Sequence, residues 1–141
     1  MKLIQTANGV STAVASGSPI NLGAIDRKAT CGECDPFNTT STSISINKPG
    51  YYLVSVDVNI IASIAGNVAV QLYDGATPIV TASASNVALA NSIYNLSFSK
   101  IVRVLPNCNA VQTNAPKVLS VYNVGVAGTI ASSNISIIKI N

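Results

Sequence analysis

Residues 51–60 alternate strictly between apolar and mainly polar side chains, and this period of two restricts the fold more than any other feature of the chain. Successive side chains of a β-strand point to opposite faces of a sheet. One face of the segment is wholly apolar, with Tyr52, Val54, Val56, Val58 and Ile60. The pattern predicts a long strand with one buried side, entered through a Pro- and Gly-containing turn at residues 47–50.

Further alternating segments follow along the chain. Residues 68–73 end at Asp74 and Gly75, a dipeptide typical of hairpin turns, so residues 78–82 are expected to return antiparallel. Two half-strands are expected in residues 94–105, joined by a bulge at 99–101. Residues 117–124 and 130–140 predict two more strands, and only residues 87–93 are compatible with a helical turn. About 8–10 antiparallel strands predict an all-β jelly-roll β-sandwich.

The chain is long enough for one domain, because 141 residues bury enough surface for a single core. Residues 41–141 are predicted to form the jelly roll. Residues 1–40 contain shorter apolar pieces and a Cys-containing loop. We expect this N-terminal part either to add edge strands to the same compact unit or to serve as an attachment segment.

Charged residues make up 9% of the chain, against about 25% in an ordinary soluble domain. Apolar residues reach 48%, mostly Val, Ile and Ala, so we expect part of the apolar surface to be covered by a partner. The chain contains no run of about 18 apolar residues, which a membrane-spanning helix would need. The N-terminus turns polar at once, unlike a signal peptide, which indicates synthesis in the cytoplasm of the producing cell.

The residues that usually carry catalysis are few. The chain has no His, and its five acidic residues are spread over separate turns and strands. No glycine-rich phosphate loop is present. The eight Lys and Arg residues are scattered along the sequence, which disfavours nucleic acid as a partner. The chain is therefore predicted to be non-enzymatic and to hold no cofactor.

Cys31, Cys34 and Cys108 lie in predicted turns, and three interpretations stay open for them. They are free surface thiols, or Cys34 forms a disulfide with Cys31 or Cys108, or a trimer gathers them around a metal on its axis. Zinc needs four ligands, and one chain offers three thiols and no imidazole, so we expect no metal site within a chain.

Residues 50–56 (Gly-Tyr-Tyr-Leu-Val-Ser-Val), the hairpin signal at 72–75 and the strand at 101–104 resemble the trimeric jelly roll of tumour necrosis factor and complement globular heads. The similarity covers residues 40–141. It implies a homotrimer and places Tyr51 and Tyr52 in the core or on the threefold interface. Tyr73, Tyr94 and Tyr122 are candidates for the same two environments.

The chain starts with Met-Lys-Leu-Ile-Gln-Thr-Ala-Asn and has a Cys-rich turn before the jelly roll. With these features, the whole chain is also similar to small proteins encoded among bacteriophage structural genes, the head fibre and capsid decoration proteins. This resemblance implies a virion surface location and the major capsid protein as partner, with Arg27 and Lys28 as candidates for attachment. Two alternatives use the same fold: a fibre tip that binds a receptor or glycan, and the trimeric cap of a spore-surface filament. The chain has no Gly-X-Y stalk for the second alternative.

Overall fold

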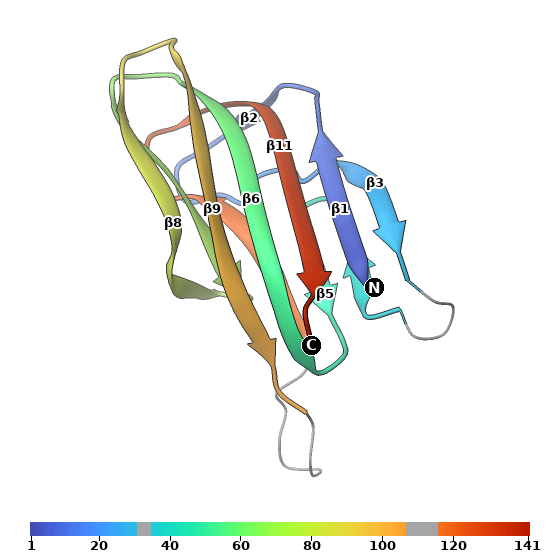
Figure 1. The fold of residues 1–141 in the computed structure, drawn as a ribbon. Helices are drawn as coiled ribbons and strands as arrows, with labels where there is room; N and C mark the ends of the chain where they lie inside the picture. Colours follow the sequence, from blue (N-terminus) through green and yellow to red (C-terminus); the bar gives the residue numbers. More distant parts are fainter. Residues whose placement is uncertain (31–34, 107–115) are drawn as a thin grey trace.

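The computed structural model describes residues 1–30, 35–106 and 116–141 and contains only strands, turns and loops there (Figure 1). The strands are β1 (Leu3–Asn8), β2 (Thr12–Val14), β3 (Ala24–Ala29), β4 (Phe37–Thr39), β5 (Ile44–Ile46), β6 (Gly50–Ala62), β7 (Gly66–Asp74), β8 (Thr77–Ala88), β9 (Ile93–Val104), β10 (Lys117–Asn123) and β11 (Gly128–Lys139).

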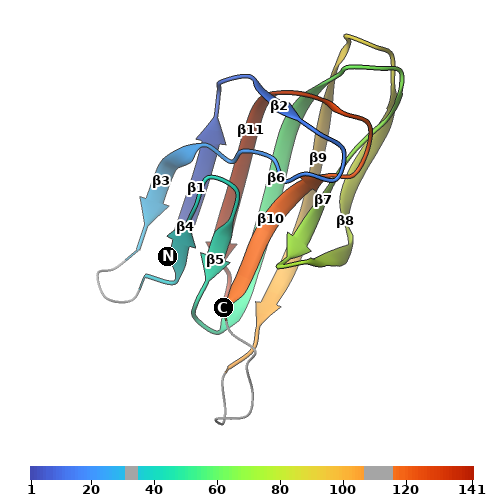
Figure 2. The ribbon, with the colours of Figure 1, turned by 180° about the vertical axis from the view of Figure 1, so that it is seen from behind.

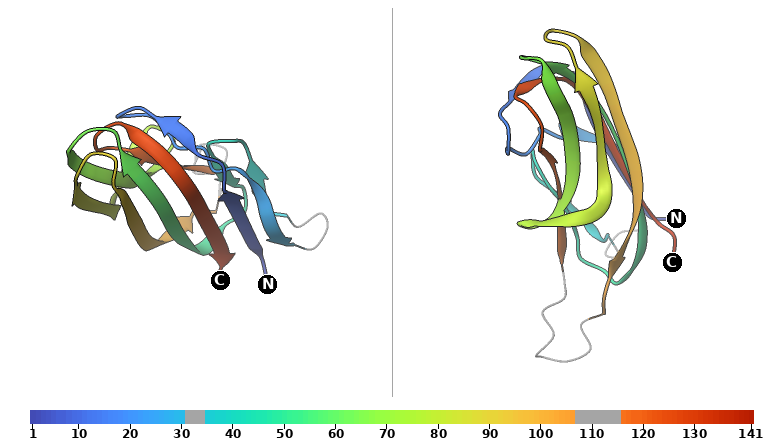
Figure 3. Two further views of the ribbon diagram at one scale, coloured as in Figure 1. Left: turned by 90° about the horizontal axis from the view of Figure 1, so that it is seen from above. Right: turned by 90° about the vertical axis from the view of Figure 1, so that its left-hand side faces the viewer.

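Two antiparallel sheets pack face to face. The larger sheet has the strand order β3-β1-β11-β6-β9, with β2 paired to one end of β11. The smaller sheet has the order β4-β5-β10-β7-β8 and covers the other side, as Figure 2 shows from behind. The right-hand view of Figure 3 shows the two layers edge-on. The predicted all-β jelly-roll sandwich is confirmed.

The core lies between the sheets and follows the alternation along β6. Tyr52, Val54, Val56, Val58 and Ile60 are all at most 2% exposed, while the intervening side chains face outward. Fully burying one such side chain stabilises the fold by about 1.5–3 kcal/mol. The regular apolar face of this strand therefore fixes which side of the larger sheet points inward.

The N-terminal part of the chain is built into the sandwich. Strand β1 lies between β3 and β11, and Ile4 is fully buried. After β2 the chain crosses to the smaller sheet, where Ile20 N–H donates a 2.8 Å hydrogen bond to the carbonyl of Val121. Residue 40, the expected limit of the N-terminal part, lies in the turn between β4 and β5.

Two local expectations are wrong. Strand β9 pairs with β6 without a register shift, so there is no bulge at residues 99–101. Every second residue of β9 faces inward without interruption, and Lys100 is one of these residues. A lysine is possible there because β9 is an edge strand, where the long Lys100 side chain reaches Thr81 of β8. The segment 87–93 has no helical turn, because β8 continues to Ala88 before the turn to β9.

Candidate functional site

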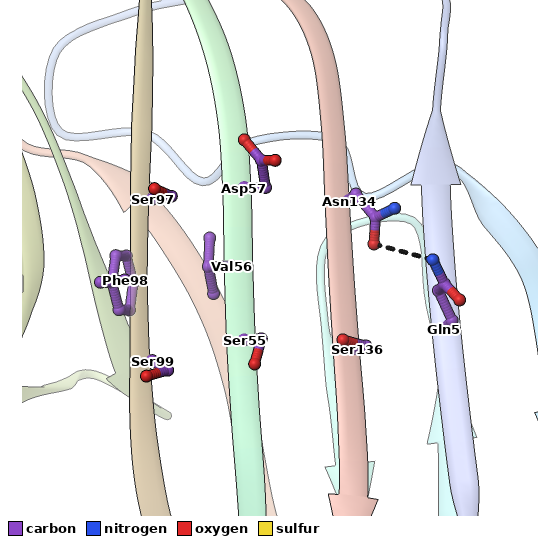
Figure 4. A pocket seen from close by; sticks show the side chains of 9 residues that line it. All are labelled: Gln5, Ser55, Val56, Asp57, Ser97, Phe98, Ser99, Asn134 and Ser136. Atoms are coloured by element: carbon purple, nitrogen blue, oxygen red, sulfur yellow. Dashed lines mark hydrogen bonds between the residues drawn. The ribbon is translucent and has the colours of Figure 1, made fainter.

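The outer face of the larger sheet carries a continuous surface of small polar side chains (Figure 4). It forms a shallow, open depression of about 500 Å³, lined by the outward side chains of Gln5, Ser55, Asp57, Ser97, Ser99, Asn134 and Ser136. Val56 and Phe98 also border it, although their side chains point towards the core. The lining comes from four neighbouring strands, β1, β11, β6 and β9. We call this surface the polar ladder.

Antiparallel pairing places these side chains in rows across the sheet. Gln5, Ser136, Ser55 and Ser99 are consecutive partners in one row. Gln5 Nε2 donates a 3.2 Å hydrogen bond to Asn134 Oδ1, drawn in Figure 4. The serines are short, so the face stays flat and another molecule can approach the sheet closely.

A second set of hydrogen bonds orders the far end of the ladder. Asn95 Nδ2 donates to Asp57 Oδ1 and, at 2.9 Å, to Asn59 Oδ1. Asn59 Nδ2 in turn donates a 2.8 Å bond to Ser132 Oγ. Asp57 is the one ionisable side chain lining the depression, so the lining supplies no acid–base pair of the kind that general acid–base catalysis uses.

An apolar row borders the ladder on the side where β6 begins. Leu3, Ile138, Leu53 and Ile101 are consecutive partners across β1, β11, β6 and β9. Ile101 is 56% exposed, and the other three are half-buried. Strand β11 has isoleucine on both of its faces: Ile135 and Ile137 face the core, while Ile138 faces outward in this row.

The β8–β9 edge of the sandwich is the other apolar surface. Its exposed side chains are Val80 (76%), Val87 (79%), Leu89 (69%) and Ile93 (61%). Tyr94 and Phe98 fill the space between the sheets at this edge and pack against the core. An edge of this kind is both apolar and open to pairing, so it favours contact with another chain.

The five tyrosines do not gather at one place. Tyr52 is fully buried in an edge-to-face contact with Phe37, its hydroxyl donates to the carbonyl of Lys48 at 2.8 Å, and burial raises the pKa of its phenol. Tyr51 lies on the outer face of the larger sheet, 41% exposed. The hydroxyl of Tyr94 accepts a hydrogen bond from the Leu89 amide at 3.0 Å.

Tyr73 and Tyr122 lie on neighbouring strands of the smaller sheet. Their ring centroids are 4.3 Å apart, and both side chains are half-buried on its outer face. They therefore stabilise each other on the surface opposite to the polar ladder.

Arg27 and Lys28 lie on β3, the free edge of the larger sheet. Lys28 forms an ion pair with Asp35, whereas Arg27 is well exposed and 3.8 Å from the Asp26 carboxylate. Burial of Asp35 opposes its ionisation, but the hydrogen bond and charge of Lys28, with the amide of Phe37, lower its pKa overall.

Cys31, Cys34 and Cys108 fall outside the described residues, so the three interpretations of these thiols stay predictions. Within the described ranges, no group of three or more His, Cys, Asp or Glu residues could hold a metal ion. The same residues include no helix long and apolar enough to cross a membrane.

No family model and no curated protein sequence matches the chain. Solved structures share its fold. The globular domain of zebrafish complement 1qA protein aligns with a TM-score of 0.69 and 9% identity over 100% of this chain and 98% of that one. The Eiger tumour necrosis factor of S. frugiperda aligns with a TM-score of 0.68 and 11% identity, over 100% and 94%.

A viral protein is also among the similar structures. The PRD1 vertex protein P5 aligns with a TM-score of 0.58 and 15% identity, covering 99% of this chain and 97% of that one. The chain has the jelly-roll fold of these proteins. At such low identity the likeness concerns the fold alone.

The polar ladder and the apolar β8–β9 edge were missed by sequence reasoning, which looked to aromatic side chains for contacts. A signal for the ladder was present in the outward positions of β6 and β9, where Ser55, Asp57, Ser97 and Ser99 replace the long charged side chains usual on an exposed sheet face. Their alignment depends on strand pairing between segments far apart in the sequence.

Proposed function

We propose that the protein is a non-enzymatic structural protein of a virus particle, a homotrimeric decoration or head fibre protein on a bacteriophage capsid. The observation that carries the proposal is the part of the larger sheet's outer face formed by the polar ladder and the apolar row, where Asp57 is the one ionisable side chain. Such a face is suited to being covered by another subunit, because covering it desolvates very little charge.

The β8–β9 edge of a second copy supplies a matching surface. Its exposed Val80, Val87 and Leu89 would be removed from water against the outer face of the neighbour. An edge that docks on a face makes a heterologous contact, and such contacts close into a ring when the rotation between copies permits. The resemblance to tumour necrosis factor and complement globular heads supports a ring of three.

The particle role rests on fold likeness and composition. The vertex protein of PRD1 has this fold, and the low charge of the chain fits a protein that works inside an assembly. On the particle, Arg27 is the attachment candidate that is more available to an acidic capsid surface, because Lys28 is held by Asp35.

Immunogold electron microscopy tests this role. Particles purified from the cells that produce the protein would be labelled with an antibody raised against the chain. Gold on the capsid surface is the expected result. A chain found only in the particle-free fraction would contradict the proposal.

A further inference from the structure

The positive charges of the chain gather towards one end of the sandwich. By strand register, all eight Lys and Arg residues lie in the half of the sandwich where β6 begins and β9 and β11 end. At the opposite end, the connections at residues 9–11, 63–65, 89–92 and 124–127 contain no charged residue. Antiparallel pairing gathers cations that are scattered in the sequence. We call the half that contains the cations the basic end.

Most of the acidic groups at this end are already engaged. Asp26, Asp35 and Asp74 lie near Arg27, Lys28 and Lys117 respectively. Among the described residues, no carboxylate lies within ion-pair distance of Arg103 or Lys139. These two cations face tyrosine rings instead: the guanidinium carbon of Arg103 is 5.5 Å from the Tyr51 centroid, and Lys139 Nζ is 5.9 Å from the Tyr52 centroid.

Arg103 and Lys139 line the same depression, about 320 Å³ in volume, together with Tyr51 and Gly50. Gly50 has a φ of 144°, and a Cβ at this position would lie 2.6 Å from Lys139 Cε. The absence of a side chain at Gly50 therefore lets the Lys139 stem lie against the base of the depression. Tyr51 and Arg103 are register partners one row beyond the apolar row, at the margin of the outer face.

We infer that this depression binds carboxylate side chains of an acidic protein surface. An Arg guanidinium presents paired N–H donors that match a carboxylate, and Lys139 adds a second positive charge beside it. The volume is at the lower limit of ligand pockets and suits one or two side chains. A nucleic acid would require cations along a groove with several stacking rings, and Tyr51 is the one aromatic residue of this lining.

The carboxylates must come from a different protein. Of the acidic residues that the structure describes, three are engaged at the basic end, and Asp57 lies in the polar ladder with Asn95. The described residues of a second copy therefore offer no free acidic cluster. The inference concerns one end of a single chain and does not depend on the trimer or on the particle role.

Binding of the full chain to immobilised poly-L-glutamate tests the inference. The double variant Arg103→Gln/Lys139→Gln should weaken binding by roughly tenfold at low salt, because two attractive contacts are lost together. The control variant Lys100→Gln/Lys117→Gln removes two positive charges from outside the depression and should change the affinity less than about twofold. Circular dichroism and a melting curve show that each variant is folded.

A charge-retaining variant, Arg103→Lys/Lys139→Arg, keeps the inference testable if the neutral variant fails to fold, and should retain salt-dependent binding. An equal loss in both Gln variants would overturn the inference, because it would show attraction to net charge alone. A larger loss in Lys100→Gln/Lys117→Gln would move the site to other cations and would overturn it as well. Stronger binding to duplex DNA or to phosphatidylglycerol vesicles than to poly-L-glutamate would identify phosphate as the ligand and also overturn the inference.

Discussion

Lys100 Nζ donates a 2.7 Å hydrogen bond to Thr81 Oγ1 and so joins β9 of the larger sheet to β8 of the smaller one. Thr81 has a φ of 66°, a left-handed conformation that a β-branched residue rarely adopts. The residue lies beside the register irregularity between β7 and β8. The edge that the proposed trimer would use therefore contains a polar link between the two sheets and a strained residue.

Replacing Thr81 separates the strain from the hydrogen bond. Thr81→Ala and Thr81→Gly both remove the hydroxyl, but only Gly removes the Cβ that disfavours a positive φ. We expect the free energy of unfolding of Thr81→Gly, measured by urea denaturation, to be about 1 kcal/mol higher than that of Thr81→Ala. Equal stabilities would contradict the strained conformation.

A buried amide connects the loops at the uncharged end. Asn123 is 0% exposed, and its Nδ2 donates to the carbonyl of Val126 at 2.9 Å while its Oδ1 accepts from the amide of Gly125 at 3.1 Å. Asn123→Ala leaves these backbone groups without partners and should lower the free energy of unfolding by about 3 kcal/mol. The exposed Asn86→Ala serves as the control, with a change within about 0.5 kcal/mol. A similar effect of both substitutions in thermal melts would show that the amide network is unimportant.

The Asp35–Lys28 ion pair should make stability depend on pH. Because the pKa of Asp35 is lowered in the folded state, its stabilisation is present above the ordinary value of 3.8 and is lost as pH falls through the folded pKa below it. Asp35→Asn should therefore cost about 1 kcal/mol at pH 7 and almost nothing once the carboxyl is protonated. Denaturant melts over this acidic range measure the difference.

Asp26→Asn is the matched control, since its pairing with Arg27 is long and exposed at 3.8 Å. Its effect at pH 7 should be small. If Asp35→Asn lost the same stability at every pH, the contribution of this side chain would come from packing and not from its charge.

The sequence was most informative where one face of a strand is continuously buried. Strand β6 could be predicted because every second side chain from Tyr52 to Ile60 is apolar. Strand β9 was less clear because Lys100 points inward, which is possible at an edge where the ammonium reaches a polar partner on the next sheet.

Surfaces built by several strands were beyond prediction from one sequence. The basic end combines residues as distant as Lys2 and Lys139, and the polar ladder combines Gln5 with Ser99 and Ser136. Sequence reasoning treated the cations as scattered, because nothing local shows which strand ends lie together. The register of the larger sheet supplies that information.

Multi-angle light scattering of the wild-type chain and of Ser136→Arg tests the proposed trimer most directly. Ser136 is half-buried in the polar ladder, and Ser45 is half-buried on the outer face of the smaller sheet, so Ser45→Arg is its matched control. The wild type and Ser45→Arg should both give three times the chain mass of 14.4 kDa, whereas Ser136→Arg should give a folded monomer, because a buried unpaired charge opposes the contact. A wild-type monomer at high concentration, or a trimer that Ser136→Arg leaves intact, would contradict assembly through the outer face of the larger sheet.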